Sequence, residues 1–106
     1  MRKVCWMFVN PGIKNGMMRQ DMVYTDDNDL MITIGVNNYE RAVEEAKKLV
    51  EEGIVFLELC AGFGYRGVAM VKEAVDGAAH VGVVTFDYHP AMDNKSGDVR
   101  YLGAKG

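Results

Sequence analysis

The sequence predicts a single small α/β domain with a mostly parallel sheet of four or five strands and two main helices. From residue 30 onward, apolar runs and amphipathic segments alternate in the order strand–helix–strand–helix–strand, which is typical of right-handed parallel crossovers. The apolar runs present apolar side chains on both alternating faces, as buried strands of parallel sheets do. The length of 106 residues fits one domain. We assign residues 1–90 to this domain and residues 91–106 to a polar C-terminal tail.

The composition excludes several classes of protein. Apolar residues make up 49% of the chain and charged residues 25%, which excludes wholesale disorder. A net charge of −3 offers no basic surface to nucleic acid. The apolar run at residues 4–9 is shorter than a signal-peptide core of about 7–15 residues, and no stretch approaches the ~20 of a membrane span. We therefore expect a cytoplasmic protein with Cys5 and Cys60 as free thiols.

The N-terminal part of the chain contains one clear strand and one irregular segment. Lys3–Val9 is the first buried strand, and Asn10-Pro11-Gly12 ends it. Residues 10–29 show no clear period beyond a short strand near 22–25 that turns through acidic residues into the strand at 30–36. An irregular segment of this length is uncommon in a compact domain, so we expect it to pack on a partner or close over a ligand.

The strongest helical pattern covers residues 39–52. Apolar side chains recur there at i, i+3, i+4 and i+7, which is the period of a helix with one buried face. Asn37 or Asn38 can cap the first turn, and Gly53 is a natural residue to end the helix.

The C-terminal half predicts a strand at 54–60, a helix at 64–76 and a last strand at 81–87. The tail that follows is mobile or docks on a neighbouring surface. A sheet this small, with methionines near residues 17–31, leaves edges or faces uncovered. We therefore expect a homodimer or a higher homo-oligomer.

The chemical signal concentrates in the glycine-rich turn at residues 58–67, between a strand and a helix. Carboxyl ends of parallel strands and amino ends of the following helices share one sheet edge, where open α/β sheets bind ligands. Backbone amides at a helix start favour anions. We hypothesise a site there for a small anionic or polar ligand. The candidate ligand-binding residues are Glu58, Cys60, Gly62, Phe63, Gly64, Arg66 and Asp87.

One alternative is a nucleotide or cofactor turn. Gly62, Gly64 and Gly67 satisfy G-x-G-x-x-G, and Asp87 stands where an acid would bind a ribose. Residues 54–87 also resemble the first motif of S-adenosylmethionine-dependent methyltransferases, which implies S-adenosylmethionine or NAD as a cofactor. The chain departs from that family because about nineteen residues follow Asp87, too few for the remaining strands. The cofactor therefore stays unassigned.

A second alternative is thiol chemistry. Cys60 and Arg66 form C-x5-R, which resembles the phosphate loop of cysteine phosphatases and rhodaneses, although Gly67 replaces their Ser or Thr. Such a loop activates a thiolate and clamps an oxyanion with Arg. The catalytic candidates are Cys60, His89 and the carboxylates of Asp87 and Glu58.

A third alternative is a purely structural protein, because glycine-rich turns also join strands to helices in proteins without a site there. Cys60 is then a small buried apolar residue. Glu58 lies within an apolar strand, so it is either a site residue or a carboxylate close enough to the strand end to reach water. The Cys and His spacings fit no zinc pattern, so no metal site is expected.

The segment E-L-C-A-G-F-G at Glu58–Gly64, preceded by the helix and the E-E-G-I-V-F strand entry, resembles a family of short uncharacterised prokaryotic α/β proteins. That family carries an E-L-C-[GA]-G-F-G core, and the resemblance is best over residues 36–86. It implies a short chain that is complete without further strands, which disfavours the methyltransferase and phosphatase alternatives. It implies no activity, so whether the protein is an enzyme stays open.

Overall fold

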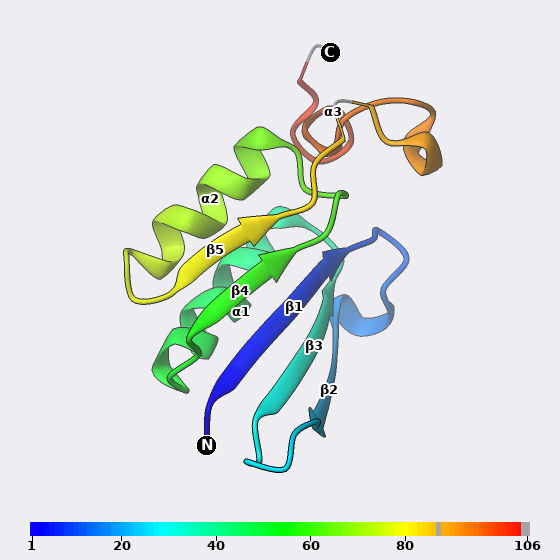
Figure 1. Cartoon of the computed structure of the whole chain (residues 1–106). Coiled ribbons are helices and arrows are strands. Elements are labelled where there is room, and N and C mark those ends of the chain that lie inside the picture. The colour runs from blue at the N-terminus through cyan, green and yellow to red at the C-terminus, as the bar shows by residue number, and fades with distance from the viewer. Residues whose placement is uncertain (87, 105–106) are drawn as a thin grey trace.

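A computed structural model describes residues 1–86 and 88–104, and it shows one mixed sheet with helices on one side (Figure 1). The strands are β1 (Lys3–Val9), β2 (Met17–Val23), β3 (Leu30–Val36), β4 (Phe56–Leu59) and β5 (His80–Val83). The helices are α1 (Tyr39–Glu51), α2 (Tyr65–Val75) and α3 (Gly97–Leu102), with short 3₁₀ turns η1 (Lys14–Gly16) and η2 (Pro90–Met92). The predicted α/β class, with a five-stranded, mostly parallel sheet and two main helices, is confirmed.

The sheet has the strand order β2-β3-β1-β4-β5, and β1 lies at its centre. β1, β3, β4 and β5 are parallel, whereas β2 pairs antiparallel with β3. Central β1 is hydrogen-bonded on both sides, with Trp6 opposite Thr33 of β3 and opposite Glu58 of β4. Its two apolar faces therefore fit the most enclosed place in the sheet.

Helix α1 forms as its sequence predicts. The side chain of Asn38 accepts a hydrogen bond from the Arg41 amide at 2.7 Å, so Asn38 is the N-cap. The helix buries Tyr39, Ala42, Glu45, Ala46 and Leu49. The chain turns out of the helix at Gly53, whose φ of +85° suits a residue without Cβ.

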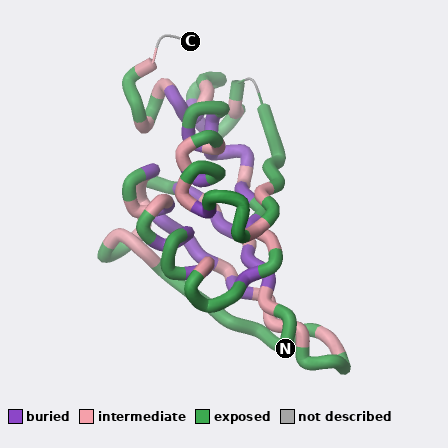
Figure 2. Tube along the Cα trace, turned by 90° about the vertical axis from the view of Figure 1, so that its left-hand side faces the viewer, coloured by how far each residue is buried: buried purple, intermediate pink, exposed green. Residues whose placement is uncertain are grey.

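Both long helices cover the same face of the sheet and pack against each other. The steps β3–α1–β4 and β4–α2–β5 move in one direction across the sheet, so right-handed crossovers put both helices on one side. The core lies between these helices and the sheet, and buried stretches gather in the middle of the trace (Figure 2).

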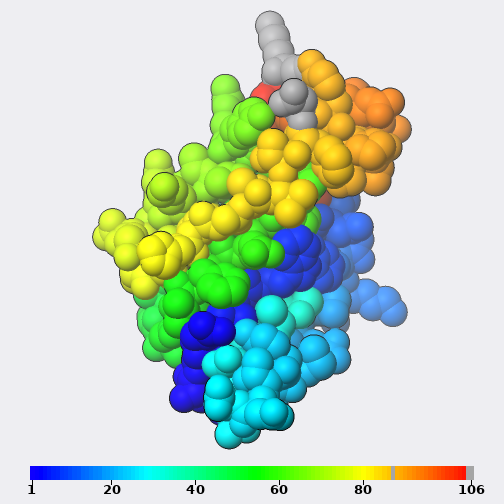
Figure 3. Space-filling model, in the orientation of Figure 1, coloured from blue at the N-terminus to red at the C-terminus, as the bar shows by residue number. Residues whose placement is uncertain are grey.

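The second face of the sheet has no helix over it in the described chain. The connection from β1 to β3 contains strand β2 in place of a helix, so nothing crosses to that side. Figure 3 views this face, where side chains from the strands form the surface directly. Half-buried apolar residues lie on it: Trp6, Phe8, Met31 and Phe56.

Four segments differ from the sequence-based expectation, and the first is β4, which covers Phe56–Leu59 in place of the predicted 54–60. Residues 10–29 contain η1 and the seven-residue edge strand β2, rather than a short strand at 22–25. Strand β5 ends at Val83, so the last strand is shorter than the predicted 81–87. Residues 90–102 form η2 and α3, and Met92, Gly97 and Asp98 are buried. This C-terminal segment therefore packs on the rest of the fold.

Among the described residues, no helix has the length and apolar character needed to cross a membrane.

Candidate ligand-binding site

A crevice forms where the chain leaves two neighbouring strands in opposite directions. From the carboxyl end of β1 the chain turns through η1 toward β2, whereas from β4 it turns through α2 toward β5. Such a topological switch point, outside the carboxyl ends of the strands, is where open α/β sheets bind their ligands. The topology therefore places a candidate site between the ends of β1 and β4.

A cavity of about 120 Å³ lies at this point, and we call it the switch-point cavity. Its volume equals roughly four water molecules at ~30 Å³ each, well below the ~300–1,000 Å³ of pockets for larger ligands. It has room for a small ion or metabolite. The nine described lining residues are Val9, Asn10, Cys60, Gly62, His89, Ala91, Met92, Arg100 and Tyr101.

The hydrogen-bond acceptors on three of the lining side chains are already used within the protein. Asn10 Oδ1 accepts from the Gly12 amide at 2.8 Å, and His89 Nδ1 accepts from the Ala91 amide at 3.0 Å. Cys60 Sγ accepts from the amide of Gly62 at 3.2 Å. The Asn10 amide group and, in the neutral ring, Nε2–H of His89 therefore remain as donors.

Helix α3 brings one cationic residue to the lining of the cavity. Arg100, an exposed residue, carries a guanidinium, which has five N–H donors and no acceptor. Burial raises the pKa of the neighbouring Tyr101 phenol, and Arg100 acts in the opposite direction. None of the nine lining residues is acidic. A lining with donors and one cation suits a ligand that carries acceptors and negative charge.

The amide groups at the start of α2 have a partner from within the chain. Asp98 of α3 accepts hydrogen bonds from the amides of Arg66 and Gly67 at 2.9 and 3.2 Å. The Tyr39 hydroxyl accepts from the Gly64 amide at 2.9 Å and donates to Asp98 at 3.0 Å. The anion that the α2 terminus favours is therefore the protein's own carboxylate.

Burial raises the pKa of Tyr39, so its hydroxyl stays protonated and keeps both of these bonds at neutral pH. Close approach of α3 depends on glycine, because a Cβ at Gly64 would overlap Asp98 and one at Gly97 would overlap the Gly62 carbonyl. Gly64 in the turn and Gly97 in α3 thus let the two segments pack closely.

The structure brings three of the predicted site residues together. Cys60, Gly62 and His89 all line the switch-point cavity, although 29 positions separate Cys60 from His89 in the sequence. Cys60 is half-buried and free. The edge of the sheet that the sequence analysis selected therefore does contain a cavity.

The other predicted residues lie elsewhere. Phe63 is in the core, stacked on Tyr39 with ring centroids 5.6 Å apart. Glu58 is exposed on the sheet face that has no helix over it, which we call the open face. Its carboxylate therefore reaches water, which is one of the two alternatives that the sequence left open. Arg66 is exposed in the first turn of α2, and Asp87 lies outside the described residues.

Sequence reasoning missed Arg100, Tyr101 and Asp98. Asp98 lies 31 and 32 positions from the amides that it caps, and no local pattern connects the two. Arg100 belongs to the segment that the sequence predicts to be a polar tail. Only the structure shows that Arg100 lines the cavity.

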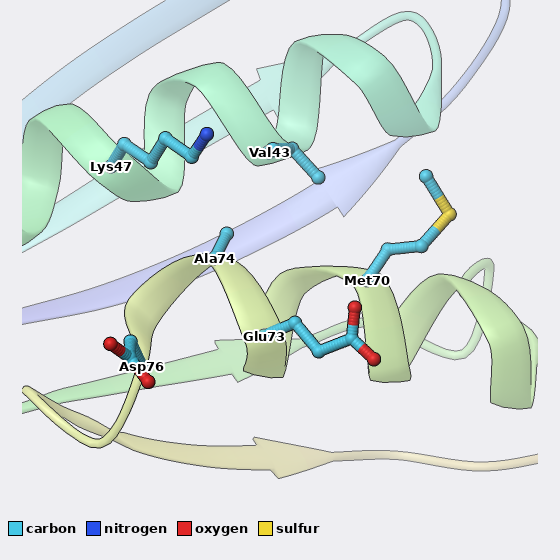
Figure 4. Close-up of a pocket in the computed structure, with 6 residues that line it drawn as sticks. All are labelled: Val43, Lys47, Met70, Glu73, Ala74 and Asp76. Atoms are coloured by element: carbon cyan, nitrogen blue, oxygen red, sulfur yellow. The ribbon is translucent and has the colours of Figure 1, made fainter.

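A larger depression, of about 480 Å³, lies between α1 and α2 on the outer surface (Figure 4). Val43, Met70 and Ala74 give it apolar walls, whereas Lys47, Glu73 and Asp76 bring one positive and two negative charges. Its lining comes from the middle of α1 and the C-terminal half of α2, whereas the carboxyl end of β4 leads into the start of α2. The switch-point cavity is therefore the stronger candidate despite its smaller volume.

The described residues contain no group of three or more His, Cys, Asp or Glu side chains placed to hold a metal ion. No curated protein and no solved structure matches the chain. A family model described as "Family of unknown function (DUF6506)" matches residues 2–99. The chain therefore belongs to this family of unknown function.

Proposed function

We propose that the protein binds a small anion in the switch-point cavity, an oxyanion such as phosphate or sulfate or a small carboxylate. One observation carries this proposal: the acceptors of Asn10, Cys60 and His89 are bonded internally, while Arg100 and the remaining side-chain groups offer donors. Donors around a cation bind anions with charge-assisted hydrogen bonds.

The same geometry gives less support to the cofactor and phosphate-loop alternatives. A bound nucleotide or oxyanion at residues 62–67 needs the amides at the start of α2, and Asp98 and Tyr39 hold three of these. The switch-point cavity is also small for a dinucleotide or S-adenosylmethionine. In this proposal, an anion beside Cys60 therefore binds to Arg100 and not to Arg66.

Part of the family-like segment forms a wall of the cavity. Cys60 and Gly62 belong to the E-L-C-A-G-F-G turn, and both line the site. We propose that this turn is the family's binding element and that the protein works in the cytoplasm, where Cys60 stays a thiol.

The test is thermal unfolding and calorimetric titration with inorganic phosphate, sulfate and acetate. A ligand at ten times its Kd raises the free energy of unfolding by about 1.4 kcal/mol, if it binds only the native state. Arg100→Met removes the cavity cation, and Arg66→Met is the matched control at the start of α2. We expect binding to wild type and Arg66→Met and at least a tenfold weaker affinity for Arg100→Met.

Saturable binding that Arg66→Met abolishes and Arg100→Met leaves intact contradicts the proposal and favours the C-x5-R alternative. The absence of saturable binding by all three anions also contradicts it.

A second candidate function is nucleophilic thiol chemistry, favoured because Cys60 and His89 line one cavity. A neighbouring imidazole can activate a thiol as a general base. For His89 this requires that Nδ1 release the Ala91 amide, because Nε2 carries the proton in the neutral ring. The rate of Cys60 alkylation by iodoacetamide tests this candidate. A His89→Gln variant is expected to react at least tenfold more slowly than wild type, and equal rates remove the candidate.

A further inference from the structure

Strand β2 leaves one long edge of the sheet open. It is the outermost strand, and Met18–Val23 are exposed along its whole length. Backbone groups on the free side of an edge strand are a template for pairing with another strand. The question is therefore which strand matches this edge.

The pairing with β3 shows which backbone groups of β2 point outward. Bonds from the Tyr24 amide to the Asp29 carbonyl and from the Asn37 amide to the Gly16 carbonyl, both 3.0 Å, continue the β2–β3 ladder at its two ends. Even-numbered residues of the strand thus bond to β3. By the alternation of antiparallel ladders, the N–H and C=O groups of Met17, Arg19, Asp21 and Val23 point away from the sheet.

The sequence of β2, M-M-R-Q-D-M-V, is complementary to itself when reversed about Gln20. An antiparallel copy in this register places Arg19 opposite Asp21 and Asp21 opposite Arg19. Met18 then faces Met22, and Met17 faces Val23. All four outward residues fall at hydrogen-bonded positions. Opposite charges or apolar side chains meet at every pair except the central one, where Gln20 faces Gln20.

We propose that two copies of this chain form a homodimer through β2, with the two-fold axis at Gln20 and one continuous sheet across both subunits. The partner is a second copy because the edge matches its own reversed sequence in charge and in apolar character. An isologous contact of this kind uses the same residues on both subunits. This inference does not rest on the proposed anion site.

The side chains on both faces of the sheet support this register. The Arg19 side chain lies on the helix side of the sheet. Its guanidinium donates two hydrogen bonds to Asp21, at 2.8 and 3.0 Å, and two to Glu52, both at 2.8 Å. In the dimer, Asp21 of the second copy lies opposite Arg19 and Arg19 of the second copy lies opposite Asp21. Two Arg and two Asp side chains therefore alternate in charge.

On the open face, the methionines of β2 are 43% (Met18) and 56% (Met22) exposed. Met18 lies with Phe8 over Gly35, so it already belongs to the apolar surface of the open face. In the dimer each methionine covers its counterpart from the second copy, and the two open faces become continuous. The pairing thereby removes part of the exposed apolar area.

The first test changes the charges of the edge. Arg19→Glu gives an all-acidic edge and Asp21→Lys an all-basic one, so each variant alone places like charges opposite each other. Sedimentation equilibrium is expected to show twice the chain mass of 11.8 kDa for wild type and the single mass for each variant. An equimolar mixture of the two variants restores opposite charges at every pair and is expected to dimerise.

The control for this test is Glu73→Lys on α2, which changes charge away from the edge and is expected to remain dimeric. Circular dichroism checks that each variant folds, since Arg19→Glu also opposes Glu52.

The second test needs no charge change and uses cysteines in a Cys60→Ser background. Gln20→Cys places two thiols opposite each other at a non-hydrogen-bonded pair, with Cα atoms about 4.5 Å apart, which a disulfide can bridge. Met18→Cys is the matched control, because its two copies are four residues out of register, roughly 14 Å apart. Oxidation is expected to cross-link Gln20→Cys and not Met18→Cys.

A wild-type chain that sediments as a monomer at millimolar concentration overturns the proposal. A dimer that both charge variants retain also overturns it, as does cross-linking of Met18→Cys in preference to Gln20→Cys.

Discussion

Replacement of Asp98 by Ala is expected to destabilise the protein by about 3 kcal/mol. Asp98 is 8% exposed as a residue, and its carboxylate accepts three hydrogen bonds: from Tyr39, from Arg66 and from Gly67. Loss of a helix cap costs about 0.5–2 kcal/mol. The Tyr39 hydroxyl, buried at 1% exposure for the residue, also loses its acceptor, which adds about 1–3 kcal/mol.

The assays are urea unfolding and thermal unfolding, each followed by circular dichroism and by the fluorescence of Trp6, the single tryptophan. At roughly 4–8 °C per kcal/mol for a domain of this size, the melting temperature should fall by about 12–24 °C. Glu73→Ala, an exposed acid on α2, is the control and should stay within about 0.5 kcal/mol of wild type.

A double-mutant cycle separates the cap from general damage to α3. Tyr39→Phe removes the hydroxyl that joins the Gly64 amide to Asp98. The losses from Tyr39→Phe and Asp98→Ala should be non-additive by at least 0.5 kcal/mol, because the two groups share a bond. An Asp98→Ala variant as stable as Glu73→Ala would refute the reasoning that α3 caps α2.

The remaining predictions concern charge and thiols. Arg19 lowers the pKa of Asp21 and Glu52, so its stabilisation is present at neutral pH and is lost as the pH falls through these lowered pKa values. At one low protein concentration, Arg19→Met should lower the free energy of unfolding by about 0.5–1 kcal/mol at pH 7 and by almost nothing near pH 2. A loss that is equal at both pH values argues against these ion pairs. Burial raises the pKa of Cys5 to about 12, whereas Cys60 is half-buried at the cavity. A disulfide reagent at pH 8 should therefore modify Cys60 alone in the native protein and both thiols in urea, and modification of native Cys5 would contradict the buried position of β1.

The sequence predicts the elements whose side chains repeat with a clear period. The strands at 3–9 and 30–36 have the predicted bounds, and α1 ends one residue before the predicted end at 52. Strand β2 is not predictable in this way, because an exposed edge strand has no buried face to impose alternation. The prediction extends the last strand beyond Val83, because apolar residues continue in the sequence there. In the structure these residues are exposed and lie outside β5.

The position of the candidate site was predictable from topology, and the set of residues that line it was only partly so. Parallel strands bring Cys60 and the residues after β5 to one edge, which explains why Cys60 and His89 share a cavity. Arg100 and Asp98 reach that edge through long-range packing of α3, which no local pattern encodes. The glycines at 62 and 64 indicated an open turn, whereas Gly64 allows α3 to approach and Gly62 allows close contact with Val9 of β1.

Titration of ¹⁵N-labelled protein with inorganic phosphate, followed by two-dimensional NMR, tests the central claim most directly. Binding in the switch-point cavity should shift the amide signals of Cys60, Gly62 and Arg100 along one saturable curve. Gly67, whose amide is bonded to Asp98, should keep its shift. A saturable shift centred on Gly67, or no saturable shift at the cavity, would contradict the account.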